Sequence, residues 1–85
     1  MKSVAVTVGT TAVQVGSGGA WINQKNVLIQ CISAGPVYVG GNDVTTTNGI
    51  SIIDGDSLAV DLLGEDVWCI SANTNTNIRV LRSGE

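Results

Sequence analysis

Hydrophobic and polar residues alternate along most of this chain, which is the pattern of strands with one buried and one exposed face. In the first segment Val4, Val6 and Val8 occupy every second position, and Val13 and Val15 repeat this spacing. We therefore expect two strands with these valines on their inner faces. The same alternation predicts strands at 50–53, 57–62, 67–72 and 78–81, with apolar faces formed by Leu58, Val60, Leu62, Trp68, Ile70, Ile78 and Val80.

A different pattern runs from Asn26 to Ser33, where apolar residues are almost continuous. Such a run is typical of a strand in the middle of a sheet. Gly35-Pro36 then precedes a short strand at 37–39, and Asp54-Gly55-Asp56 has the composition of a hairpin turn. The polar stretch 44–49 is expected to form a loop that crosses an edge of the fold.

These segments amount to about eight short strands at the spacing of β-sandwiches and barrels. Composition agrees, because Val, Ile and Thr contribute 12, 8 and 8 of the 85 residues and Gly contributes 11. We expect an all-β protein with one domain over residues 1–85, a small antiparallel β-sandwich or jelly-roll-like barrel. Because a sandwich of this size has a small core, association with other copies or neighbours is the expected source of further stability.

The charged residues disfavour several classes of function. The chain has no His, so the usual general base near neutral pH and the commonest metal ligand are missing. Four Lys and Arg against seven Asp and Glu give a net charge of −3, and the scattered cations do not predict nucleic-acid binding. No apolar run approaches the ~20 residues of a membrane span. The opening segment lacks the character of a secretory signal, so we expect synthesis in a cytoplasm and no membrane partner.

Two cysteines, Cys31 and Cys69, lie 38 positions apart. They are either a stabilising disulfide or two buried thiols that pack as small hydrophobic side chains. The second interpretation is favoured, because nothing in the sequence indicates an oxidising compartment.

Two motifs have both a chemical and a structural interpretation. Gly16-Ser17-Gly18-Gly19 resembles a phosphate-binding loop, but such a loop needs a following helix and a strand is expected next. Asp54-Gly55-Asp56 could bind Ca²⁺ together with Asp61 or Asp43, but it lacks the spacing of a calcium loop. A flexible loop and a tight turn are favoured instead. The sequence therefore predicts no catalytic residue, no metal ligand and no cofactor.

The aromatic residues suggest where a partner could bind. Trp68 alternates in step with an apolar face and is expected in the core, whereas Trp21 lies in a Gly-rich loop. An aromatic residue in such a loop is either tucked beneath it or an anchor at an interface. A binding module would bring Trp21 together with Asn42, Asp43 and Asn73 at one end of the fold.

Five segments in order carry a family resemblance. They are Lys25-Asn-Val-Leu-Ile-Gln-Cys-Ile, Gly35-Pro-Val-Tyr-Val-Gly-Gly-Asn-Asp-Val-Thr-Thr-Thr-Asn-Gly-Ile, Asp54-Gly-Asp-Ser-Leu, Val67-Trp-Cys-Ile-Ser-Ala and Ile78-Arg-Val-Leu. In this order the chain resembles small structural proteins of tailed bacteriophages, which include capsid decoration (cement) proteins and fibre domains of heads and tails. The matching residues belong to strands and turns, so they indicate a fold more directly than a role. Cys31 and Cys69 depart from the pattern.

The resemblance implies a small jelly-roll sandwich, a homotrimer that binds the major capsid protein on the outer surface of the virion and stabilises the shell. A free-standing domain favours this decoration role over a fibre module. Residues 1–8 are the expected docking or exchanged strand, and the candidate interface residues are Val4, Val6, Trp21, Lys25 and Tyr38. The alternative is a receptor- or glycan-binding module of a phage head or tail appendage. An enzyme is not expected, because so small a sandwich has little surface for a catalytic cleft.

Overall fold

The computed structural model describes residues 2–17, 26–33, 35–62 and 65–82, and these residues form eight β-strands and no helix. The strands are β1 (Lys2–Val8), β2 (Val13–Ser17), β3 (Asn26–Ser33), β4 (Val37–Gly40), β5 (Ile50–Ile52), β6 (Ser57–Asp61), β7 (Asp66–Ser71) and β8 (Thr76–Arg82). All paired strands are antiparallel. The predicted all-β class is confirmed.

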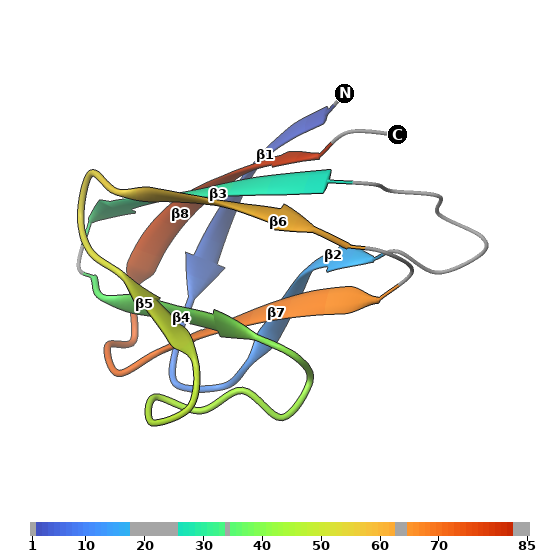
Figure 1. Ribbon diagram of the computed structural model, residues 1–85. Coiled ribbons are helices and arrows are strands. Elements are labelled where there is room, and N and C mark those ends of the chain that lie inside the picture. Colours follow the sequence, from blue (N-terminus) through green and yellow to red (C-terminus); the bar gives the residue numbers. More distant parts are fainter. Residues whose placement is uncertain (1, 18–25, 34, 63–64, 83–85) are drawn as a thin grey trace.

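The strands form two four-stranded sheets that pack face to face (Figure 1). Sheet I has the order β1-β8-β3-β6, and sheet II has the order β2-β7-β4-β5. Only the connection from β4 to β5 stays within one sheet, and every other connection crosses between the two sheets. This is the strand order of a jelly roll, the double-sheet sandwich built from two Greek keys. The predicted jelly-roll-like sandwich is therefore confirmed.

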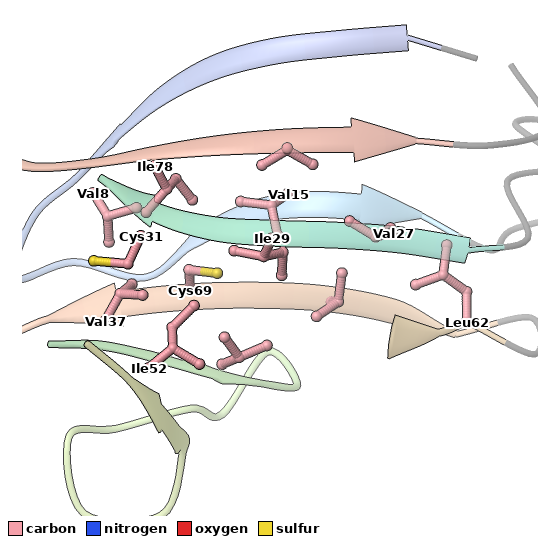
Figure 2. Packing of buried hydrophobic residues seen from close by; sticks show 13 residues of the cluster. Val8, Val15, Val27, Ile29, Cys31, Val37, Ile52, Leu62, Cys69 and Ile78 are labelled. Carbon is pink, nitrogen blue, oxygen red and sulfur yellow. The ribbon is translucent and has the colours of Figure 1, made fainter. Parts of the chain in front are cut away.

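The core fills the space between the sheets with aliphatic side chains of small and medium size (Figure 2). Strand β3 is central, as predicted, and its Val27, Ile29 and Cys31 are fully buried while the residues between them are exposed. The buried cluster contains Val, Ile, Leu and Cys side chains and no aromatic side chain. Burial of each Val or Ile contributes about 1.5–3 kcal/mol, so this cluster is the main stabilising feature of the fold.

The two cysteines enter the core from opposite sheets, Cys31 from β3 and Cys69 from β7 (Figure 2). Both thiols are free and fully buried, so the interpretation as buried thiols is confirmed. Burial raises the pKa of Cys69 to about 12, and burial followed by a hydrogen bond to Asp54 raises the pKa of Cys31. Because a thiolate is the reactive form of cysteine, neither side chain is a nucleophile near neutral pH.

Strand β7 buries the face opposite to the one predicted. Its core-facing residues are Val67, Cys69 and Ser71. Trp68 and Ile70 are half-buried on the outer face, so the prediction that Trp68 belongs to the core is wrong. Val67, Cys69 and Ser71 are smaller than Trp68 and Ile70, and they fit between two sheets whose buried cluster contains no aromatic side chain. Ser71 is tolerated in this core because its hydroxyl is hydrogen-bonded.

The turn at Asp54-Gly55-Asp56 is confirmed as a turn but is not a hairpin, because β5 and β6 belong to different sheets. Gly55 has a φ of 85°, in the left-handed region that favours glycine. Its backbone N–H donates to the Cys31 carbonyl at 2.8 Å, and the Asp54 carboxylate accepts a hydrogen bond from the Gly35 N–H at 2.7 Å. The turn is therefore tied to β3 and to the connection that leads into β4.

The predicted break after Val15 is displaced along the chain. Strand β2 continues through Gly16 to Ser17 after a β-bulge between Gln14 and Gly16. The remainder of the Gly-rich loop, at 18–19, lies outside the described residues.

Candidate interaction surface

The expected interface residues do not form one cluster. Val4 and Val6 lie half-buried on β1, an edge strand of sheet I, whereas Tyr38 lies half-buried on β4 in sheet II. Trp21 and Lys25 lie outside the described residues. A surface for a partner therefore has to be located from the exposed faces of the two sheets.

The outer face of sheet I carries apolar side chains that no described part of the fold covers. In the strand register, Leu28 of β3 lies between Leu81 of β8 and Ala59 of β6. Leu28 and Ile32, both on β3, are 40% and 41% exposed. Strand β3 thus has apolar residues on both of its faces, and the described structure covers only the inner one.

A groove of about 420 Å³ runs across this face over β1, β8 and β3. Its described lining is mostly apolar or small and includes Ala5, Leu28 and Leu81. Arg79 is the one charged residue in that lining, and its guanidinium donates to the adjacent Ile78 carbonyl at 3.2 Å. The groove can therefore accept apolar side chains beside a single positive charge. We call the groove and its surroundings, formed by Ser3, Ala5, Leu28, Gln30, Arg79 and Leu81, the sheet I face.

A second hollow, of about 230 Å³, opens between the two sheets beside β5 and β6. Leu58 and Val60 contribute apolar walls, and Asp61, Glu65 and Asp66 contribute carboxylates. Among the described residues no group of His, Cys, Asp or Glu side chains is arranged to hold a metal ion. This hollow is an open edge of the sandwich with an acidic border.

The outer face of sheet II also carries an apolar patch. Tyr38 of β4 is directly opposite Ile70 of β7, and Trp68 of β7 lies opposite Gly40 of β4. Tyr38, Ile70 and Trp68 are half-buried, whereas Leu28 and Ile32 of sheet I are exposed. The sheet II patch is more fully covered than the sheet I face.

The amide and carboxylate residues expected at a sugar-binding end are separated. Val37 pairs with Ser71 and Gly40 pairs with Trp68, so Asn42 and Asn73 follow opposite ends of the β4–β7 ladder. The described residues therefore do not bring Asn42 and Asp43 together with Asn73.

The sequence contains an indication of the sheet I face in the uninterrupted apolar run of β3. The sequence analysis used this run only to predict a central strand. An uninterrupted apolar strand is usual where both faces of a sheet are covered. In this fold nothing among the described residues covers the outer side of β3, so Leu28 and Ile32 are left exposed. Residues such as Leu81 and Ala59 could not be assigned to the same face without the register of β3 with β8 and β6.

No protein-family model, curated protein or solved structure matches this chain. In the described part of the chain, no helix is long and apolar enough to cross a membrane. The function has to be argued from the surfaces themselves.

Proposed function

We propose that this chain is a structural virion protein of a tailed phage, which binds the outer surface of the capsid through the sheet I face and stabilises the shell. The observation that carries the proposal is the uncovered apolar face of a jelly-roll sandwich, with Leu28 exposed in the groove and Ile32 exposed further along β3. Jelly rolls recur in viral capsid and lectin domains, and the sequence resembles phage decoration proteins. The major capsid protein is the proposed partner.

The physical role of such a protein is to bind the capsid protein in the assembled shell and not in its other states. A ligand that binds only one state of an assembly stabilises that state by mass action. An oligomer, here a proposed trimer, that contacts several capsid subunits at once gains further strength from multivalency, because each later contact is intramolecular. The mostly apolar sheet I face suits a contact that is made once and kept.

The first test is the copy number of this chain in purified phage particles, measured by quantitative mass spectrometry against the major capsid protein. A ratio near one, or a simple lattice fraction of it, supports a protein that covers the shell. A few copies per particle would transfer the role to a vertex or tail and favour the receptor-binding alternative. Absence from intact particles would refute both virion roles.

The second test locates the contact on the protein. Leu28→Glu places a carboxylate in the centre of the sheet I face, and Ile53→Glu makes the same change at an isoleucine that is 58% exposed in the turn after β5. We expect Leu28→Glu to lose co-sedimentation with undecorated capsids, because a buried unpaired charge is costly at an interface. Ile53→Glu should bind as the wild type does. Equal binding by both variants would show that the sheet I face is not the contact.

A further inference from the structure

Two dipeptides of this chain are of the kind that rearranges most readily in proteins. They are Asn48-Gly49, in the loop between β4 and β5, and Asp54-Gly55, in the turn before β6. In such a pair the backbone nitrogen of the glycine can attack the side-chain carbonyl carbon of the residue before it, which closes a succinimide ring. Glycine favours this closure because it has no Cβ and its backbone rotates freely. Asn48 and Asp54 are both exposed, so burial does not keep water from either site.

The fold requires a glycine in both dipeptides. A Cβ added at Gly49 would lie 2.7 Å from the Tyr38 Cβ and 2.9 Å from the Val44 Cγ2, closer than packed atoms approach. Gly55 has a φ of 85°, which other residues adopt only with strain. Replacing either glycine would therefore remove the reactive dipeptide at a cost to the fold.

The reacting groups of Asn48-Gly49 are held by hydrogen bonds that oppose ring closure. The Asn48 side-chain oxygen accepts from the Thr45 N–H at 2.7 Å, and the Asn48 side-chain amide donates to the Asp43 carbonyl at 3.3 Å. The Gly49 N–H, whose nitrogen is the nucleophile, donates to the Thr45 carbonyl at 3.1 Å. Closure requires this nitrogen to lose its proton and the Asn48 side chain to rotate toward it. The folded loop therefore has to break these bonds before the ring can form.

Asp54-Gly55 is held in the same way but by a different part of the fold. The Gly55 N–H donates to the Cys31 carbonyl at 2.8 Å, and the Asp54 carboxylate accepts from the Gly35 N–H at 2.7 Å. These partners belong to β3 and to the connection into β4, whereas the partners of Asn48-Gly49 lie within its own loop. Opening of the loop at 43–49 should therefore release Asn48 and leave Asp54 in place.

We propose that Asn48 is a deamidation site that the folded loop protects, and that opening of residues 43–49 exposes it to an irreversible change. In the open loop the Gly49 nitrogen gives its proton to solvent and bonds to the Asn48 Cγ, and the side-chain nitrogen takes up a proton and leaves as ammonia. Water then opens the ring to aspartate or isoaspartate, so one water is consumed for each ammonia released. The product has no side-chain N–H to donate to the Asp43 carbonyl, so the closed loop is not restored. This reaction needs only water and does not rest on capsid binding.

The test follows deamidation of the full chain at mildly alkaline pH by peptide mass spectrometry, after digestion with pepsin in acid. Thr45→Ala removes the hydroxyl that accepts from the Asn48 N–H at 3.3 Å and from the Thr47 N–H at 3.2 Å. This variant should deamidate at Asn48 about tenfold faster than the wild type when folded, because the rate follows the population of the open loop. Thr46→Ala, at the exposed neighbouring residue, is the matched control and should leave the rate unchanged. In urea all three chains should react at one rate, at least about tenfold above that of the folded wild type, because residues 47–49 are identical in them.

Three results would overturn the proposal. In the first, the folded wild type deamidates at Asn48 as fast as the chain in urea, so that the loop gives no protection. In the second, Thr45→Ala reacts no faster than Thr46→Ala. In the third, Thr45→Ala also speeds isoaspartate formation at Asp54, measured by enzymatic methylation of isoaspartate, which would indicate a general loss of stability and not the opening of one loop. Far-UV circular dichroism shows that each variant is folded.

Discussion

Removing one buried hydroxyl, in Ser71→Ala, tests whether the strand connections at one end of the sandwich depend on a polar cluster inside an apolar core. Ser71 is 1% exposed at the end of β7. Its hydroxyl donates to the Pro36 carbonyl at 3.1 Å, accepts from the Asn73 N–H at 3.1 Å and lies 2.6 Å from the Thr76 hydroxyl. These bonds use the one donor and two acceptor sites of a serine hydroxyl.

The hydrogen bonds of the Ser71 hydroxyl determine how much stability the substitution should remove. Since Ser71 donates to Pro36, Thr76 is the donor of the short bond between the two hydroxyls. Each hydrogen bond contributes about 0.5–1.5 kcal/mol, and a buried polar group that loses its partner costs about 1–3 kcal/mol. We therefore expect Ser71→Ala to lower the free energy of unfolding by about 2–4 kcal/mol. That is a large share of the roughly 4–13 kcal/mol expected for a domain of this length.

Equilibrium unfolding in urea, followed by circular dichroism at one protein concentration, measures this difference. Ser51→Ala is the matched control, because Ser51 is exposed on β5, and it should change stability by less than about 0.5 kcal/mol. A double-mutant cycle with Thr76→Val should give a coupling energy of about 1 kcal/mol. If Ser71→Ala were as stable as Ser51→Ala, the hydroxyl cluster would contribute nothing and the reasoning would be wrong.

Two further predictions concern the thiols and the turn before β6. Burial raises the pKa of Cys69 from 9.0 to about 12, so the folded state holds the thiol proton more tightly than the unfolded state. This contribution to stability is complete below pH 9.0 and declines as the pH rises toward about 12, and Cys69→Val should flatten that part of a stability–pH profile. In the native protein at neutral pH, thiol reagents should label neither cysteine until denaturant is added. Gly55→Ala should cost about 1–2 kcal/mol in urea unfolding, because φ is 85° and nothing lies within 4 Å of an added Cβ, so backbone strain acts alone. Gly55→Asn should cost less, and an equal cost for both would argue against the strain.

Local patterns predicted the strands well where one of the two alternating sets of residues in a strand is clearly more apolar than the other. Asn26–Ser33 was predicted with the bounds that the structure has, and Leu58, Val60 and Leu62 face inward as expected. The pattern is ambiguous in β7, where both alternating sets contain apolar residues. The larger side chain of Trp68 then favoured the wrong face, because the Pro36 carbonyl that accepts from the buried Ser71 hydroxyl lies 35 positions away in the chain.

Connections between strands were harder to predict than the strands themselves. Asp54-Gly55-Asp56 has the composition of a tight turn, and the positive φ of Gly55 agrees. Whether the chain then stays in one sheet depends on long-range packing, which a three-residue pattern does not contain. The candidate interaction surface has the same limit, because a face such as that formed by Leu28, Leu81 and Ala59 exists only once three strands are in register.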